Sequence, residues 1–280
     1  MRNKGMVALI TGGAGGIGAA IARRLAADGA AAIGIGDIDL AAAESMADQL
    51  NKSGVRAFAA RVDVGDAEQV RALIAGAEKT LGPIDLMCSN AGIFTASAEE
   101  ASDQDWERSW RVNVMSNVYV AREIVPRMIS RGGGYLMITC SAAGLLANRN
   151  APYMATKHAA VAFAEWLAIQ YRSRGLIVSA LCPLGVQTSM LDRLMADDGV
   201  AAAGVLAGGE VLQPEQVAGA VIEGIAAQRF LILPHEAVRD RIVSKASDRD
   251  RWIGSMERQY GIVTGAPAVG PDPDVTRAQF

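Results

Sequence analysis

The segment Thr11-Gly12-Gly13-Ala14-Gly15-Gly16-Ile17-Gly18 follows an apolar run at residues 6–10 and precedes a helical pattern at 17–27. Glycines allow a sharp turn and let a ligand approach the backbone closely. A helix that starts directly after such a turn offers free N–H groups and a partial positive charge, which together bind a pyrophosphate. The spacing fits both the dinucleotide fingerprint G-x-G-x-x-G and a wider variant, G-x-x-x-G-x-G. A flexible turn without a ligand is the alternative, but the strand–loop–helix context favours the phosphate site.

Short β-rich runs alternate with longer helical patterns along the rest of the chain. Several of the runs, such as DLMC and YLMITC, are apolar on both faces, as in strands of a parallel sheet that is covered on both sides. This order predicts an α/β fold, a Rossmann-type doubly wound parallel sheet of about seven strands with helices on both faces. The strands are expected at 6–11, 31–36, 56–62, 85–89, 134–140, 177–182 and 230–233, and the helices at 17–27, 40–52, 67–81, 104–131, 153–174 and 214–227.

The composition excludes several classes of protein. Of 280 residues, 51% are hydrophobic and 20% are charged, a balance opposite to that of disordered chains. The net charge is −3 and no basic block occurs, so neither nucleic acid nor an anionic membrane is expected as a partner. Three widely spaced cysteines, Cys88, Cys140 and Cys182, indicate neither a disulfide framework nor a metal site. No run reaches the roughly 20 apolar residues of a membrane span or the core of a signal peptide, so a cytoplasmic protein is expected.

An acid after the second predicted strand indicates which dinucleotide binds. Asp37 lies nineteen residues after Gly18, where the fingerprint expects a carboxylate that accepts hydrogen bonds from the adenosine ribose. A carboxylate there also repels a 2′-phosphate, and Asp39 adds a second negative charge, so NAD is favoured over NADP. Alternatively, either acid caps the helix that starts near Leu40, in which case one can cap while the other binds ribose.

Tyr153 and Lys157 are four residues apart on a predicted helix, so their side chains share one face. An ammonium group beside a phenol favours the phenolate, which makes such a pair an acid/base catalyst. Most pairs at this spacing are ordinary helix surface. The upstream glycine segment and Ser141, directly after an apolar strand, favour the catalytic interpretation here.

These motifs occur together and in order, and with them the chain resembles the short-chain dehydrogenase/reductase family over about residues 5–235. The resemblance is carried by Thr11-Gly12-x-x-x-Gly16-x-Gly18, Asp63-Val64, Asn90-Ala91-Gly92, Asn113, Ser141, Tyr153-x-x-x-Lys157 and Pro183…Thr188. Two positions depart from the family pattern, since Ser89 replaces an asparagine and Leu184 stands in place of the usual glycine after Pro183, where it adds bulk beside the expected nicotinamide pocket. Cys140 stands where a second serine is common and is expected in the core.

The resemblance implies a role for each motif. Tyr153 exchanges a proton with the substrate oxygen, Lys157 supports Tyr153 and binds the nicotinamide ribose, Ser141 hydrogen-bonds the substrate oxygen, and Asn113 orders a proton-relaying water. The expected cofactor-binding residues are Gly12, Gly15, Gly16, Ile17, Gly18, Asp37, Asp63, Val64, Asn90, Ala91, Gly92, Tyr153, Lys157, Pro183, Val186 and Thr188, and no metal ligand is expected.

Several of these residues also have a purely structural interpretation. Asn113 fits an ordinary polar position on a long helix, and Asn90 fits a turn. Asp63 can cap the helix near residue 67, although Asp66 is better placed, and Ser141 can cap a short helix.

The implied activity is the NAD-dependent interconversion of a secondary alcohol and its ketone, with a neutral hydrophobic substrate. The alternatives are a ketoreductase of acyl-carrier substrates and a catalytically silent NAD-binding regulatory protein. Arg149 and Arg193 are the only candidates to hold a substrate carboxylate. The expected apolar pocket residues, which otherwise simply cover the core, are Leu145, Leu146, Met190, Leu191, Leu194 and Met195.

One domain is expected over residues 1–260, with a substrate lid at 189–213 and a C-terminal tail at 261–280. Residues 236–260 read either as a helix that closes the pocket or contacts a neighbouring subunit, or as an amphipathic surface helix. The resemblance implies a homotetramer, or else a dimer, built on helices at 113–131 and 153–173. Close helix packing would use the alanine-rich face Ala155, Ala159, Ala162 and Ala168, unless this face packs on the chain's own sheet.

Overall fold

A computed structural model describes residues 5–95, 101–147, 150–197, 205–206 and 209–264. Within these residues a seven-stranded sheet has the order β3-β2-β1-β4-β5-β6-β7, and every pairing is parallel. This sheet confirms the predicted fold class. The strands are β1 (Val7–Thr11), β2 (Ala32–Asp37), β3 (Arg56–Arg61), β4 (Leu86–Ser89), β5 (Gly134–Thr139), β6 (Leu176–Leu181) and β7 (Leu231–Ile232).

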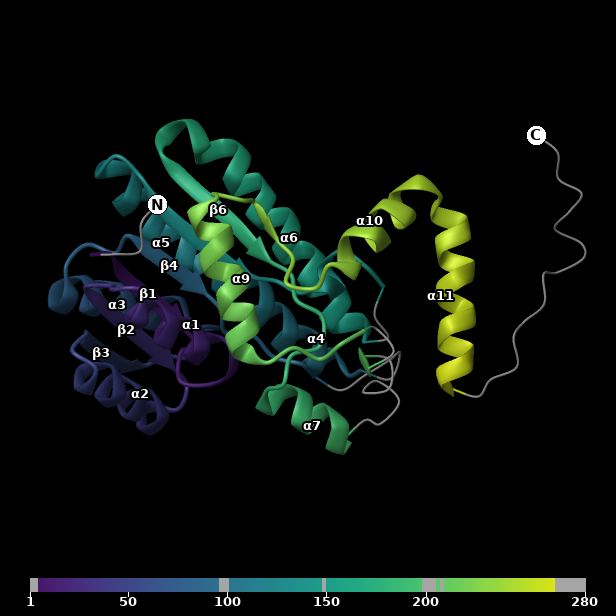
Figure 1. The fold of residues 1–280 in the computed structure, drawn as a ribbon, viewed down its shortest axis with the longest axis horizontal. Helices are drawn as coiled ribbons and strands as arrows, with labels where there is room; N and C mark the ends of the chain where they lie inside the picture. Colours follow the sequence, from purple (N-terminus) through teal and green to yellow (C-terminus); the bar gives the residue numbers. More distant parts are fainter. Residues whose placement is uncertain (1–4, 96–100, 148–149, 198–204, 207–208, 265–280) are drawn as a thin grey trace, which may run out of the picture.

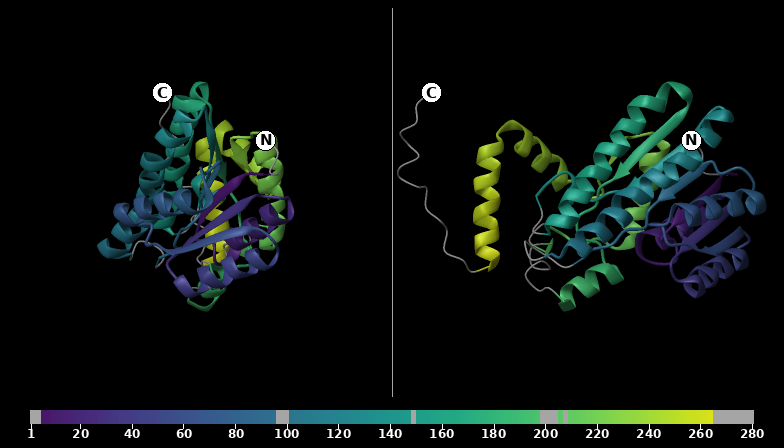
Figure 2. Two further views of the ribbon diagram at one scale, coloured as in Figure 1. Left: turned by 90° about the vertical axis from the view of Figure 1, so that its left-hand side faces the viewer. Right: turned by 180° about the vertical axis from the view of Figure 1, so that it is seen from behind.

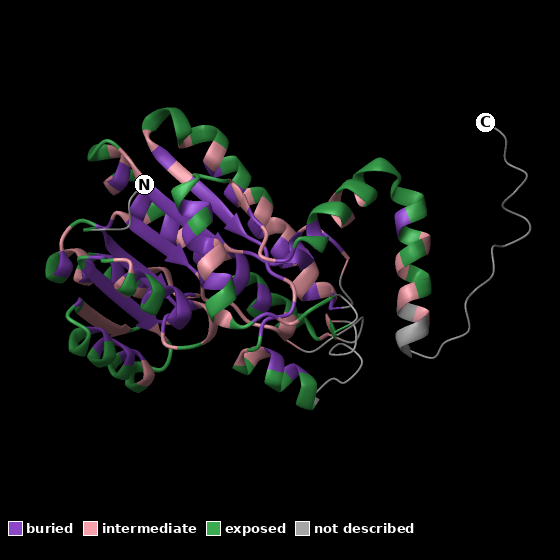
Figure 3. Cartoon of the chain, in the orientation of Figure 1, coloured by how far each residue is buried: buried purple, intermediate pink, exposed green. Residues whose placement is uncertain are grey.

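Helices cover both faces of the sheet (Figures 1 and 2). One core lies between the sheet and α1, α2 and α9, and a second lies between the sheet and α3, α5 and α6. Strands β1, β2, β4, β5 and β6 are almost entirely buried, as their continuous apolar runs predicted, whereas the edge strand β3 is only partly buried (Figure 3). The helices are α1 (Gly16–Ala27), α2 (Leu40–Lys52), α3 (Ala67–Leu81), α4 (Asp103–Trp110), α5 (Ser116–Ser130), α6 (Ala151–Tyr171), α7 (Ser189–Asp197), α9 (Pro214–Ala226), α10 (Ala237–Ser247) and α11 (Arg249–Thr264).

The strand order places a ligand crevice between β1 and β4. From β1 the chain proceeds outward to β2 and β3, then crosses back to β4 on the other side of β1. The connections after β1 and β4 therefore leave in opposite directions at their carboxyl ends. An open α/β sheet binds its ligands at such a reversal point.

The helical stretch predicted over 104–131 is present as a continuous run from Asp103 to Ser130, but it is not α-helical throughout. A π-helical segment, η1 (Arg111–Met115), separates α4 from α5. In this segment side chains bond to backbone carbonyls, since Ser116 Oγ donates to Val112 O (2.6 Å) and Asn117 Nδ2 donates to Asn113 O (2.8 Å). Such π segments recur at functional sites, and this one carries the predicted catalytic residue Asn113.

The C-terminal region forms two helices rather than one. Asp248 separates them, because its extended backbone ends α10 and its carboxylate accepts a hydrogen bond from Arg251 N (2.9 Å) at the start of α11. Helix α11 continues to Thr264, so residues 261–264 of the expected tail are helical, and the remainder of that tail lies outside the described residues. In Figure 1 both helices lie at the end of the molecule toward which the strand arrows point.

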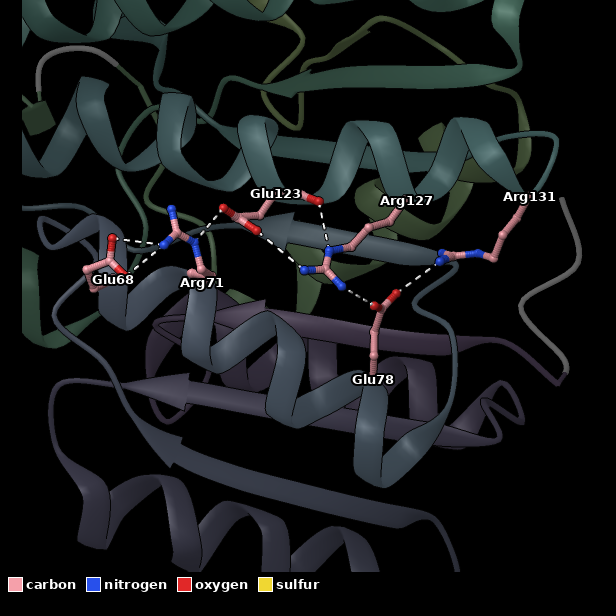
Figure 4. A network of polar contacts seen from close by, with 6 residues as sticks. All are labelled: Glu68, Arg71, Glu78, Glu123, Arg127 and Arg131. Carbon is pink, nitrogen blue, oxygen red and sulfur yellow. Dashed lines mark hydrogen bonds and ion pairs between the residues drawn. The ribbon is translucent and has the colours of Figure 1, made fainter.

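An ion-pair network joins α3 to α5 on the outer surface (Figure 4). Glu78 bonds both Arg127 and Arg131 at 3.0 Å, and Glu123 bonds Arg71 (3.0 Å) and Arg127 (3.4 Å). Single exposed pairs contribute at most about 1 kcal/mol each. Several such pairs act together here and hold the two helices in register. The network lies outside the crevice.

Candidate active site

A cavity of about 720 Å³ opens at the carboxyl ends of the strands. The predicted residues Gly18 and Asn113 do not line this cavity. All the other predicted site residues do, namely Gly12, Gly15, Gly16, Ile17, Asp37, Asp63, Val64, Asn90, Ala91, Gly92, Ser141, Tyr153, Lys157, Pro183, Val186 and Thr188. The topology thus brings motifs from the carboxyl ends of six strands, β1 to β6, into one cavity.

The glycine loop leaves the N-terminus of α1 open toward the cavity. Gly12 and Gly16 have positive φ values of 61° and 49°, which side-chain-bearing residues rarely adopt. Gly15 precedes the helix, no side chain caps it, and the position where a Cβ would stand is empty. By contrast, side chains cap α2, α3, α4 and α6. An uncapped helix end beside an open cradle fits the pyrophosphate of a dinucleotide.

Gly18 is required by packing within the loop. A Cβ at Gly18 would collide with Gly12 O and would stand 2.7 Å from Asn90 Nδ2. That amide donates to Thr11 O (3.1 Å) and Gly12 O (3.2 Å), while Asn90 Oδ1 accepts from Thr139 Oγ1 (3.0 Å). The Asn90 side chain therefore holds the glycine loop against β4 and β5, in agreement with its interpretation as a turn residue.

The two acids after β2 have different partners. Asp39 caps α2 by accepting from Ala42 N (3.1 Å). Asp37 instead accepts from Ala14 N (3.1 Å) in the glycine loop and from Asp39 N (3.2 Å). The cap is thus assigned to Asp39, which leaves the Asp37 carboxylate on the cavity wall beside the glycine loop.

Asp66, not Asp63, caps α3. Its carboxylate accepts from Glu68 N (2.9 Å) and Gln69 N (3.2 Å), and the bond from Gln69 is the main reason why the pKa of Asp66 is lowered. Asp63 Oδ1 accepts from Gly65 N (2.8 Å) and turns the chain after β3. Asp63 and Val64 therefore line the cavity as the motif predicts.

Tyr153 and Lys157 project from the first turns of α6. Asn150 caps this helix through Tyr153 N (2.7 Å). The Lys157 Nζ donates to Thr139 O (3.1 Å) at the end of β5 and lies 5.6 Å from the centre of the Tyr153 ring. Lys157 is buried, and the Phe94 ring packs 4.9 Å from that of Tyr153, so the ammonium acts in a partly water-excluded setting.

Ser141 caps a short helical turn, as one interpretation of its position predicted, and the residue also lines the cavity. Its Oγ accepts from Ala143 N (3.1 Å) and so caps a short 3-10 turn, η2 (Ala142–Gly144). Its hydroxyl proton points to Pro183 O at 3.5 Å, the outer limit of a hydrogen bond. The hydrogen bond from the Ser141 hydroxyl is therefore weak, and this hydroxyl can instead donate to a substrate oxygen in the cavity.

Asn113 lies behind the cavity wall. The Oδ1 atom accepts from Ile93 N (2.9 Å), and Nδ2 donates to Ile93 O (3.1 Å) and Thr156 Oγ1 (3.2 Å). A Cβ at Gly92 would stand 3.3 Å from Asn113 Oδ1 and 3.2 Å from Lys157 Nζ. Asn113 thus joins the π segment to the catalytic helix close to the lysine, and it is not an ordinary exposed polar residue.

The cysteines offer no nucleophile. All three are buried, and burial raises the pKa of Cys88 to about 12. Cys140 touches the cavity, and its hydrogen bond to Cys182 together with burial raises the pKa of Cys182. Cys140 itself is buried, which agrees with the core position expected for it.

Several cavity residues were not predicted. Phe94, Arg108 and Arg111 come from the β4–α5 region, and Arg241, Trp252, Met256 and Gln259 come from α10 and α11. The apolar spacing at 236–260 was the signal for the second group, and the structure shows these helices lining the pocket. Leu184 packs in the same cluster as Trp252 and Met256.

The expected apolar pocket is largely present. Leu146, Met190, Leu191 and Leu194 line the cavity, whereas Leu145 and Met195 do not. Arg193 lines it as well, but its Nε donates to Ser189 O (3.2 Å), and Arg149 lies outside the described residues. In the described part of the chain no group of three or more potential ligands gathers for a metal ion, and no helix is long and apolar enough to cross a membrane.

Fold and site together define an α/β oxidoreductase with a tyrosine–lysine pair in a dinucleotide-type cleft. The chain belongs to the short-chain dehydrogenase family, whose family model matches residues 6–199. This match confirms the predicted family and enzyme class.

Individual relatives agree with this assignment. The 1-deoxy-11-beta-hydroxypentalenate dehydrogenase of Streptomyces exfoliatus is 34% identical over 252 residues, or 88% of this chain and 89% of that protein. Cyclohexanol dehydrogenase of Acinetobacter sp. (strain SE19) is 32% identical over 218 residues, or 77% of this chain and 85% of that one. A short-chain dehydrogenase/reductase from Burkholderia phymatum, crystallised in complex with NAD, has a TM-score of 0.80 at 28% identity and covers 97% of this chain and 99% of its own.

Proposed function

We propose that the protein is an NAD-dependent oxidoreductase that interconverts a secondary alcohol and its ketone. The observation that carries the proposal is one cavity that holds both Tyr153, Lys157 and Ser141 and the uncapped end of α1 with Asp37. The first group can transfer a proton to or from an alcohol oxygen. The second group fits the pyrophosphate and adenosine ribose of a dinucleotide. Family membership and the NAD complex of the Burkholderia phymatum relative support NAD.

The chain's own residues perform the acid/base part of this reaction. The Tyr153 hydroxyl exchanges a proton with the substrate oxygen, and the Lys157 ammonium lies 5.6 Å from the centre of its ring. Ser141 donates its weakly engaged hydroxyl proton to the same oxygen. Asn113 does not line the cavity, and from the family resemblance we infer that it orders a water that returns protons past Lys157. Bound NAD supplies the hydride acceptor at its nicotinamide ring.

The substrate we propose is a neutral, hydrophobic alcohol. The walls beyond the catalytic residues are mostly apolar, and α11 contributes Trp252 and Met256 to them. One observation favours a second candidate, an alcohol that carries a carboxylate. Arg241 lines this cavity, and among the described residues no carboxylate forms an ion pair with it.

A screen of secondary alcohols with NAD, followed by NADH absorbance, tests the function. We expect hydrophobic cyclic alcohols to be oxidised, with NAD used in preference to NADP. Comparison of each neutral alcohol with its carboxylate analogue, on the wild type and on Arg241→Gln, separates the two substrate classes. NAD binding without turnover of any alcohol or ketone would instead support a catalytically silent protein.

We also propose a homotetramer in which α6 packs against its copy. Five residues at a spacing of four, three, four and three lie along one partly exposed stripe of α6, namely Ala155, Ala159, Ala162, Trp166 and Ile169. The alanines allow close approach of two helices, and Ile169 is 70% exposed in the single chain. An apolar stripe of this kind is typical of a helix–helix interface.

A further inference from the structure

His235 is a buried histidine that the acid/base mechanism does not use. It follows β7 and precedes α10, and its side chain reaches the turn after β6. There Nδ1 accepts from Leu184 N (3.2 Å), and Nε2 bonds to Gly185 O (3.2 Å). A backbone N–H only donates and a carbonyl only accepts, so the ring is neutral with its proton on Nε2. Burial lowers the pKa of His235, which agrees with this neutral form.

The turn that His235 holds forms one wall of the cavity. Pro183, Leu184, Gly185 and Val186 all line it. On one side, Pro183 O accepts from Ala142 N (2.8 Å) and, at 3.5 Å, from the Ser141 hydroxyl. The turn therefore contacts the segment that carries Ser141.

On its other side the same turn reaches the glycine loop. Val186 forms a β-bridge with Leu212, and Thr188 Oγ1 donates to Val186 O (3.2 Å). A Cβ at Gly16 would stand 3.0 Å from Thr188 Cγ2, so Thr188 lies directly beside the pyrophosphate cradle. The segment 183–188 thus spans the cavity from Ser141 to the start of α1.

The backbone groups of Leu184 and Gly185 need the partners that His235 supplies. The Leu184 side chain packs in the cluster with Trp252 and Met256, and its backbone N–H donates to His235 Nδ1. Gly185 O already accepts from Leu212 N (3.1 Å) and takes His235 Nε2 as a second donor. A neutral imidazole satisfies one donor and one acceptor on adjacent residues, which no aliphatic side chain does.

We propose that His235 is a positioning residue for the nicotinamide half of the NAD site. The imidazole fixes the backbone of Leu184 and Gly185, and through it the wall that carries Val186 and Thr188. The adenosine half is built from other loops, around Asp37 and Asp63, which His235 does not touch. This inference rests on the proposed function, in that the cavity binds NAD.

The test compares binding of NADH with binding of ADP-ribose, which lacks the nicotinamide. Calorimetry on the full-length wild type, His235→Phe and His235→Gln gives both dissociation constants for each protein. We expect the phenylalanine variant to bind NADH about tenfold more weakly, since two backbone groups lose their partner, and ADP-ribose within about twofold of wild type. Glutamine offers one donor and one acceptor and is expected to restore most of the NADH affinity.

Other outcomes contradict the inference in distinguishable ways. If His235→Phe weakens both ligands equally, or neither, His235 has only a structural role and the proposed function stands. If the wild type binds neither ligand, the proposed function fails and the inference fails with it.

A second measurement does not depend on any variant folding. The chain has two histidines, so ¹⁵N spectra of the wild type contain two imidazoles. Saturation with NADH is expected to shift the His235 ring resonances, and ADP-ribose is expected to leave them in place. Unchanged resonances with NADH bound would overturn the positioning role.

Discussion

The Lys157 ammonium lies 5.6 Å from the centre of the Tyr153 ring and is held there by the carbonyl oxygen of Thr139, 3.1 Å away. The two side chains share one face of α6, while their anchor comes from the end of β5. This arrangement joins the catalytic helix to the sheet edge that carries the cofactor cradle. The Lys157 ammonium is thus held beside the phenol by the end of β5.

Removal of the Asp37 carboxylate should change the cofactor preference. We expect wild type to bind NAD at least tenfold better than NADP, and Asp37→Ala to narrow that ratio, because the 2′-phosphate no longer meets a negative charge. Fluorescence titration with both reduced cofactors measures the ratio. Asp66→Ala is the matched control, which loses a helix cap worth about 1 kcal/mol but keeps the preference. Equal affinities for the two cofactors in wild type would refute the role of Asp37.

Substitution by alanine should have different effects at Gly15 and Gly18, although both residues belong to the glycine loop. Gly18→Ala places a Cβ against Gly12 O and is expected to lower the free energy of unfolding by about 1–3 kcal/mol. Gly15→Ala meets open space at a φ of −145°, so its stability should stay near wild type while its NADH binding weakens. Urea denaturation and NADH titration of both variants separate the effects. A stable Gly18→Ala variant would show that the loop is not packed as described.

Acid should destabilise the fold through His158. Burial and the Lys245 ammonium, 3.3 Å from Nε2, lower the pKa of His158. Below about pH 6.5 the unfolded chain therefore binds a proton that the folded chain does not yet bind, so stability falls as the pH falls, by at most about 1.4 kcal/mol per pH unit. Arg249 adds to this repulsion.

Denaturation at about pH 7.5 and about pH 5.5 tests this effect. His158→Gln should reduce the loss of stability at the lower pH, although His235, whose pKa is also lowered, continues to contribute. A wild-type stability that is constant over this range, or that rises toward acid, would contradict the neutral form of His158.

The apolar stripe on α6 should control the oligomeric state. Trp166→Glu combined with Ile169→Glu is expected to reduce the mass in solution from a tetramer to smaller species, because charges are then desolvated at the helix contact. Light scattering measures the mass, for a subunit of 29.3 kDa. Val243→Glu, at an equally exposed position on α10, is the control. A wild-type protein that is a monomer in solution would contradict the proposed homotetramer.

The sequence predicts most of the sheet and the cavity because both depend on local patterns. Apolar runs locate strands, and a glycine loop, an acid and a tyrosine–lysine pair at fixed spacings locate the site. Contacts between residues far apart in the chain produce no local sequence pattern of this kind. The bonds from Asn113 to Ile93 accompany a π segment inside a continuous helical pattern, and Trp252 reaches the cavity from a helix far along the chain.

Leu184 and His235 show the same limit. The leucine is visible in the sequence as an unusual turn residue, but nothing local connects it with a histidine 51 positions later. Only the parallel pairing of β6 and β7 brings the two residues together.

Tyr153→Phe tests the central claim most directly. We expect NADH formation from the best alcohol substrate to fall by about 10²–10⁴-fold or more, because phenylalanine lacks the oxygen that accepts the alcohol proton. The NADH dissociation constant should stay within about threefold of wild type, since the ring itself remains. Tyr171→Phe, on the same helix but outside the cavity, should leave both values unchanged. Undiminished turnover in Tyr153→Phe, with NADH still bound, would contradict the proposed chemistry.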